Sequence, residues 1–219
     1  MTKRILFLGR DSYDIDKTYD LPIPHCCYIS DFIPRYQKGC MDNGKSINRV
    51  RFHKLLLQVA YGILDKRGPL KWQDVLNAKS ICEDHIIFNK VSFAFMNLGK
   101  VSHESSEPCG VNADWDKIKF AVDVSTGKRN FIKEEVELLA PDLMIAMNLN
   151  ENPLGRDYYG SVFGANLIRK VPDCNVYDVE LSCDKHIPLL DCWHFSGRFC
   201  EEKYIYQPIV NALRAIGFY

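Results

Sequence analysis

Short, mostly apolar segments that end in polar residues recur along the chain and limit the folds it can adopt. The sequences RILFL at 4–8, VSFAFMNL at 91–98, DLMIAMN at 142–148 and PLLDCW at 188–193 each have the length of a strand. Continuous apolar runs of this length are typical of strands buried on both faces, as in a parallel sheet. A shorter strand, NVYDVEL, is expected near 175–181. This pattern favours an α/β protein.

Helical patterns lie between these strands. Apolar residues recur at helical spacing over 46–65, with Ser46 as the expected N-cap, and over 128–139, where Pro141 ends the helix. A short helical piece is expected at 72–77 and a closing helix at 201–215. Strands that alternate with helices predict a central, mostly parallel four-stranded sheet flanked by helices. Because no internal repeat occurs, we expect residues 1–219 to form a single domain.

Four polar residues stand at or just past the ends of the expected strands: Asp11, Asn97, Asn148 and His194. Ligands of open α/β sheets bind beyond the carboxyl ends of the strands, so one sheet edge should gather these side chains. Long polar segments at 10–45 and 100–116 follow two of the strands, and loops of this length are usually functional or disordered. Asn148 is expected to adopt a positive φ, which asparagine tolerates.

Composition restricts the partner and the compartment. The 28 Lys and Arg balance 28 Asp and Glu, so a nucleic-acid site would have to be a local basic patch. We expect no secretory signal and no membrane span, since no window approaches roughly 18 consecutive apolar residues. The nine cysteines contain no C-x-x-C pair, and we interpret them as reduced structural thiols of an intracellular protein, cytoplasmic or, in a eukaryote, nuclear. A disulfide framework or metal cluster is the alternative.

Three motifs resemble those of uracil-DNA glycosylases. GRDSYD at 9–14 resembles the GQDPYH motif of that family, FAFMNLGKV at 93–101 resembles its strand ending in a base-reading asparagine, and HFSGR at 194–198 resembles its HPSP loop. VELLAPDLMIAMN at 136–148 is similar to the helix and strand that precede that loop. The order and rough spacing agree over nearly the whole chain. The resemblance implies a glycosylase-like α/β fold and a monomeric, monofunctional DNA glycosylase that uses no metal and no cofactor.

The resemblance also implies roles for particular side chains. Cleavage of an N-glycosidic bond develops positive charge on the sugar and negative charge on the leaving base. By resemblance, Asp11 is the carboxylate that stabilises the sugar cation and orients water, and His194 is the donor to the departing base. Asn97 would hold the flipped base by its Watson–Crick edge, because an amide offers a donor and an acceptor together. Tyr13 would block position 5 of the pyrimidine and so reject thymine.

Further contacts are implied by weaker matches. Tyr28, in HCCYIS at 25–30, takes the place of the stacking phenylalanine of the family, although Phe32 competes for that role. Arg198 stands where the family inserts a leucine wedge into DNA, and an arginine there could stack or clamp a phosphate. Arg10 and Ser196 are expected to contact DNA as well. The expected partner is DNA that contains uracil or another modified or damaged pyrimidine.

The chain departs from the family pattern in both loops. Ser12 and Asp14 replace a proline and a histidine of the first motif, and Phe195 and Gly197 replace the two prolines of the last. Each lost proline removes a fixed backbone angle, which can loosen a loop or reshape the pocket. Without paired cysteines around the first motif, we expect no iron–sulfur cluster.

Plainer interpretations stay open at this point. Asp11 could be a turn or N-cap residue, Asn97 could hydrogen-bond the backbone, and His194 could be a satisfied core histidine. Arg198 could be a solvated charge, and the basic segment RVRFHK at 49–54 is better explained as the outer face of a helix than as a phosphate track. The alternative function is a non-catalytic module of this fold that binds nucleic acid, a nucleotide or a protein partner. A hydrolase or nucleotide enzyme outside the family is disfavoured, because no G-x-S-x-G, P-loop or G-x-G-x-x-G motif occurs.

Overall fold

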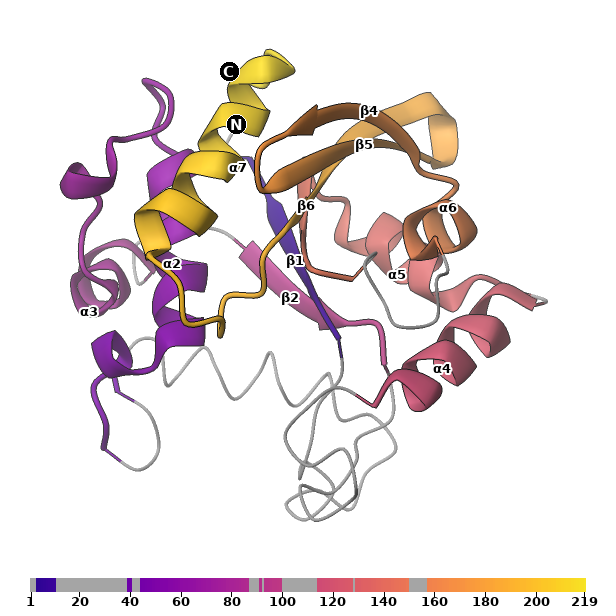
Figure 1. The fold of residues 1–219 in the computed structure, drawn as a ribbon, viewed down its shortest axis with the longest axis horizontal. Coiled ribbons are helices and arrows are strands. Elements are labelled where there is room, and N and C mark those ends of the chain that lie inside the picture. Colours follow the sequence, from indigo (N-terminus) through magenta and orange to yellow (C-terminus); the bar gives the residue numbers. More distant parts are fainter. Residues whose placement is uncertain are drawn as a thin grey trace.

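The computed structural model describes residues 3–10, 39–40, 44–86, 91, 93–99, 114–127, 129–149 and 157–219. Within these ranges a single sheet carries helices on both faces (Figure 1). Its strands are β1 (Ile5–Gly9), β2 (Phe93–Asn97), β3 (Leu143–Met147), β4 (Asn166–Val171), β5 (Cys174–Leu181) and β6 (Lys185–Cys192). The α-helices are α2 (Arg51–Ile63), α3 (Ala78–Ile81), α4 (Trp115–Gly127), α5 (Phe131–Leu139), α6 (Tyr158–Phe163) and α7 (Gln207–Ala215).

The sheet has six strands in the order β2-β1-β3-β6-β5-β4. The first four run parallel, and in their register Gly9 lies beside Asn97 and Met147 beside Cys192. β5 and β4 extend this sheet antiparallel. The expected α/β class is confirmed, but the expected four-stranded sheet is wrong: the four long apolar segments form the parallel part, and a hairpin adds two more strands to it.

Both faces of β1 and β3 are buried, which explains their continuous apolar sequences, whereas the edge strand β2 is mostly half-buried. Ile5 and Phe7 of β1 face the layer of α2 and α7, whereas Leu6 and Leu8 face the layer of α5 and α6, and none is more than 2% exposed. Figure 1 shows α2, α3 and α7 on one side of the sheet and α4, α5 and α6 on the other. A strand between two helical layers needs apolar residues at every position.

The expected helices are confirmed with changed ends. Asn130 caps α5 by accepting a hydrogen bond from the Lys133 N–H, and the helix ends at Ala140 (φ 45°), directly before Pro141. The segment expected as a helix from Ser46 begins as a 3-10 helix, Ile47–Arg49, and α2 starts only at Arg51. The Ser46 side chain makes no cap hydrogen bond, so its expected role as N-cap is wrong.

Several other elements differ from the sequence-based expectations. The helical piece expected at 72–77 is a 3-10 helix, Trp72–Asp74, and the closing helix begins with a π-helical turn, Glu202–Tyr206. α4, α6 and β4 were not expected. β4 is an edge strand with an irregular register, and its Leu167 and Ile168 are about half exposed, so neither alternation nor a buried run marks it.

Two findings concern membrane-spanning helices and the cysteines. Among the described residues, no helix combines the length and the apolar character needed to cross a membrane. Of the cysteines whose side chains are described, Cys40, Cys82, Cys174, Cys192 and Cys200 are all free thiols.

Candidate functional site

The carboxyl ends of the four parallel strands meet at one edge of the sheet, as expected. Asn97 ends β2, Asn148 follows β3, and His194 follows β6 after one residue. Asn148 has a φ of 55°, which confirms its expected positive value. The expected site residues Asp11, Tyr13 and Tyr28 lie outside the described residues, as do Ser12, Asp14 and Phe32.

The end of β1 is shaped to fit Asn97. A Cβ added to Gly9 would lie 2.3 Å from Asn97 Oδ1 and 2.5 Å from the Phe95 ring. Only glycine therefore leaves room for these two side chains against the end of β1. Two backbone hydrogen bonds extend the pairing beyond the strands: Leu98 N–H to Gly9 C=O at 3.1 Å and Gly99 N–H to Arg10 C=O at 2.7 Å. The backbone of Gly9 and Arg10 is therefore fixed beside Leu98 and Gly99, the residues that follow Asn97.

His194 is held by an aromatic ring and by its own loop. Its imidazole stacks on Phe52 with ring centroids 5.7 Å apart and planes 24° apart, and Phe52 in turn meets Phe95 edge-on at 5.5 Å. The Ser196 N–H donates to His194 Nδ1 at 3.2 Å, and the Gly197 N–H donates to the His194 C=O at 2.8 Å. Since Nδ1 accepts, the proton of the neutral imidazole is assigned to Nε2, which becomes a donor.

Electrostatics keep this imidazole uncharged. Burial and, to a smaller extent, the positive charge of Arg10 together lower the pKa of His194 from 6.5 to about 4. Burial acts this way because the charged form loses more hydration than the neutral form. At neutral pH, His194 is therefore a neutral hydrogen-bond donor.

The three residues expected to contact DNA have different environments. The Arg10 guanidinium lies over the Trp115 ring, 5.2 Å from its centroid, and donates to the Asn148 C=O at 3.5 Å, so it binds protein groups at this edge. The side chains of Ser196 and Arg198 are exposed on the loop after β6.

A buried anchor replaces the rigidity that prolines would give this loop. Phe195 is fully buried and packs against Phe7 with ring centroids 5.9 Å apart. Gly197 makes room for the Phe199 ring, because a Cβ there would lie 2.1 Å from it. The loop is thus fixed by packing.

Two residues of the basic segment 49–54 bind the chain that follows the loop after β6, at Phe199 and Glu201. Arg51 donates to Glu201 Oε1 at 3.0 Å and to the Phe199 C=O at 2.7 Å, and Lys54 donates to both Glu201 oxygens at 2.6 and 2.8 Å. These contacts agree with the helix-face interpretation. Phe52 between them was missed from sequence as a site residue; an aromatic residue inside a basic segment was its only signal.

Asn97 and His194 face the edge from different strands. β1 and β3 lie between β2 and β6, so the two strands are roughly 14 Å apart at about 4.8 Å per strand spacing. The Phe52 ring connects the two sides, because it contacts both Phe95 of β2 and His194.

No protein-family model matches the chain, and no curated protein matches it. Within the described part of the chain, no group of three or more His, Cys, Asp or Glu side chains could hold a metal ion. The geometry at the sheet edge therefore carries the functional conclusion.

Proposed function

We propose that this protein is a DNA glycosylase of the uracil-DNA glycosylase type, which hydrolyses the N-glycosidic bond of a flipped uracil or another modified or damaged pyrimidine. The observation that supports this most is the neutral imidazole of His194, whose proton is assigned to Nε2. It lies at the same sheet edge as Asn97, whose side chain packs against Gly9. The three sequence motifs supply the identity of the reaction.

The reaction breaks the bond between C1′ of the sugar and the ring nitrogen of the base. The electron pair leaves with the base, a water oxygen bonds to C1′, and the proton that this water loses passes to solvent, from which the departed base takes up one proton. Nε2–H of His194 donates to a base oxygen as negative charge develops on it. A preorganised donor of this kind lowers the barrier by about 3 kcal/mol.

Asp11 and Asn97 complete the proposed chemistry. Asp11 stabilises positive charge on the sugar and orients the water, as the resemblance implies. Asn97 reads the Watson–Crick edge of the flipped base. Gly9 supports this role only by leaving room for the Asn97 side chain. Tyr13 selects uracil over thymine.

A second function is favoured by one specific observation. Phe52 covers one face of His194, and Arg10 is turned toward Asn148, so two groups of the site bind protein atoms. A non-catalytic module that keeps this fold and binds nucleic acid, a nucleotide or a protein partner fits such an arrangement.

An excision assay separates the two functions. Uracil-containing single and double strands, and a panel of modified pyrimidines, are incubated with protein and then cleaved with alkali. We expect cleavage with wild type, loss of product with Asp11→Asn, and a loss of about 10²–10³-fold in rate with His194→Gln. His186→Gln is the matched control, since His186 is exposed and bonds to Asp178 at the far end of β6. Wild-type protein that produces no abasic site on any substrate would favour the module.

A further inference from the structure

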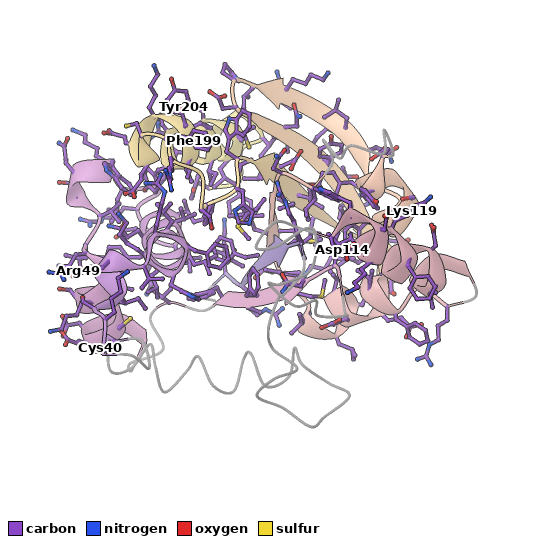
Figure 2. All side chains as sticks on the ribbon, turned by 60° about the horizontal axis from the view of Figure 1, so that its bottom comes forward. Cys40, Arg49, Asp114, Lys119, Phe199 and Tyr204 are labelled. Carbon is purple, nitrogen blue, oxygen red and sulfur yellow. The ribbon has the colours of Figure 1, made fainter. Side chains whose placement is uncertain are left out.

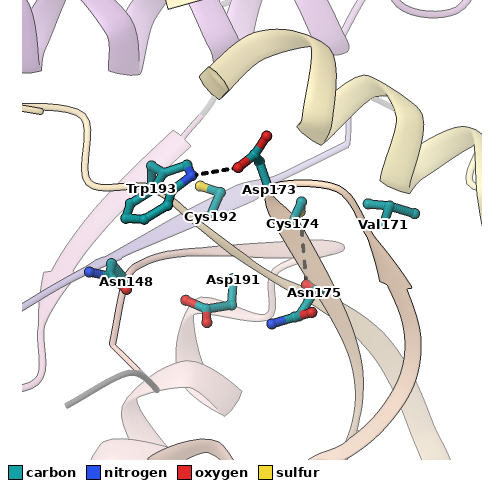
Figure 3. A pocket seen from close by; sticks show the side chains of 8 residues that line it. All are labelled: Asn148, Val171, Asp173, Cys174, Asn175, Asp191, Cys192 and Trp193. Atoms are coloured by element: carbon teal, nitrogen blue, oxygen red, sulfur yellow. Dashed lines mark hydrogen bonds between the residues drawn. The ribbon is translucent and has the colours of Figure 1, made fainter. Parts of the chain in front are cut away.

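A cavity of about 240 Å³ lies beside the candidate site, at the ends of β3 and β6 and the start of β5 (Figure 3). Pockets for drug-sized ligands measure about 300–1,000 Å³, so this one suits a single heterocycle. Eight of the described residues line it: Asn148, Val171, Asp173, Cys174, Asn175, Asp191, Cys192 and Trp193.

The lining selects for hydrogen-bond donors. Two carboxylates and two amides contribute oxygen atoms, and none of the described residues that line the cavity is basic. A phosphate or another anion would be repelled here, whereas a ligand that presents N–H groups would be bound. The donor set also does not suit a metal ion, because the described residues contain no suitable group of three ligands.

Asp191 is the best-defined polar group of the cavity. It is 7% exposed, and its Oδ1 accepts hydrogen bonds from the Tyr159 hydroxyl at 2.6 Å and from the Leu149 N–H at 3.4 Å. Burial and the Asp191 charge raise the pKa of Tyr159 well above its usual value, so the hydroxyl keeps its proton and donates. The carboxylate is therefore fixed in one orientation before any ligand arrives.

The remaining walls are neutral and partly aromatic. The Trp193 indole N–H donates to Asp173 Oδ1 at 2.9 Å, which fixes the ring at the cavity mouth (Figure 3). Cys174 and Cys192 lie opposite each other in the strand register, and burial raises the pKa of Cys174 to about 12 and that of Cys192 well above its usual value, so both remain thiols. A flat ring could lie against such walls.

Aromatic residues continue from the cavity along the surface. Trp193 and Phe199 are both more than one-third exposed, and their ring centroids are 5.4 Å apart. Phe199 is followed by Tyr204 at 6.1 Å, and Figure 2 shows these two side chains next to each other in the C-terminal segment. Exposed aromatic rings of this kind are stacking platforms for unpaired bases.

We propose that this cavity is a second binding pocket, which takes an unpaired nucleobase with adjacent N–H donors, as on the amide and amino edge of guanine. The two donors bind the Asp191 carboxylate, and the ring lies against Trp193. Neither Asn97 nor His194 lines this cavity: Asp191 contacts Tyr159 in the α6 layer, whereas His194 contacts Phe52 of α2. The choice of a nucleobase rests on the proposed function, since DNA supplies the base.

Calorimetry with deoxyguanosine and deoxyinosine tests the pocket on the whole chain. These nucleosides carry no phosphate, and deoxyinosine differs by lacking the amino group. We expect wild-type protein to bind deoxyguanosine at least tenfold more tightly than deoxyinosine, and Asp191→Asn to lose this preference. Asp178→Asn, on the same hairpin but paired with His186, should keep it.

Nuclear Overhauser contacts between H8 of deoxyguanosine and the Trp193 ring in wild type need no variant, so an unstable Asp191→Asn protein does not remove the test. Equal binding of both nucleosides, no binding, or contacts elsewhere would overturn the pocket. N-acetyl-arginine amide, whose guanidinium presents N–H donors without a nucleobase, is the competing probe. If it binds in preference to deoxyguanosine, the nucleobase assignment is overturned. Uracil excision is measured separately: excision without deoxyguanosine binding refutes only the pocket, and deoxyguanosine binding without excision refutes only the glycosylase.

Discussion

His194 should stay uncharged down to about pH 4, and this has a measurable cost in stability. Its pKa is lowered from 6.5 to about 4 in the folded protein, chiefly by burial and then by the charge of Arg10. Between these pH values the unfolded chain binds one more proton than the folded chain does. The free energy of unfolding therefore falls by about 1.4 kcal/mol for each unit of pH decrease in this window, or about 3 kcal/mol in all. Above pH 6.5 the imidazole is neutral in both the folded and the unfolded chain, so His194 causes no loss of stability there.

Denaturant unfolding from pH 7.5 to pH 4 measures this contribution as the difference between wild type and His194→Gln. The carboxylates titrate in both proteins, so the difference isolates the imidazole. We expect the wild type to lose about 3 kcal/mol more than the variant over the window. Nitrogen-15 NMR of the labelled histidines should show His194 protonated on Nε2 alone.

His186 is the control with the opposite sign. Its pKa is raised by the hydrogen bond and charge of Asp178, so its contribution is present below pH 6.5 and is lost as pH rises through the raised folded value. A His194 that titrates near 6.5, or that carries its proton on Nδ1, would refute the reasoning from burial and from the Ser196 N–H.

Three further substitutions test the packing around the site. Gly9→Ala should cost about 1–3 kcal/mol of stability by overpacking and should impair excision, whereas Gly127→Ala, where a Cβ meets no atom within 4 Å, should cost nothing in thermal unfolding. Glu201→Gln weakens two partly buried ion pairs and should destabilise the protein by about 1 kcal/mol. Glu134→Gln, whose partner is largely exposed, should leave the midpoint of the same denaturant titration nearly unchanged. Tyr159→Phe removes the buried hydroxyl that donates to the Asp191 carboxylate and should lower the free energy of unfolding by about 1–3 kcal/mol. An unchanged denaturation midpoint would contradict the hydrogen bond between Tyr159 and Asp191.

The parallel half of the sheet was predictable because its chemistry is local. Strands between two helical layers need uninterrupted apolar residues, and β1, β2, β3 and β6 carry them. The carboxyl ends of parallel strands share one edge, so Asn97, Asn148 and His194 could be placed together from sequence. The positive φ of Asn148 followed from the tolerance of asparagine for that conformation.

The rest depended on contacts that no local pattern encodes. β4 is an exposed edge strand, and α4 exposes Phe120 and Val124 where an amphipathic helix would place polar residues. The stacking of Phe52 on His194 joins residues far apart in the chain. The cavity at Asp191 arises only where the β5–β6 hairpin meets the end of β3, so no local sequence pattern indicated it.

The central claim is tested most directly by following the bond that the enzyme would break. Wild-type protein acts on a uracil-containing oligonucleotide in water enriched in oxygen-18, and both products are weighed by mass spectrometry. Hydrolysis predicts intact, unlabelled uracil and one heavy oxygen at C1′ of the abasic sugar, with neither product from Asp11→Asn. Uracil that stays attached to the sugar, for this substrate and for every modified pyrimidine tried, would contradict the claim.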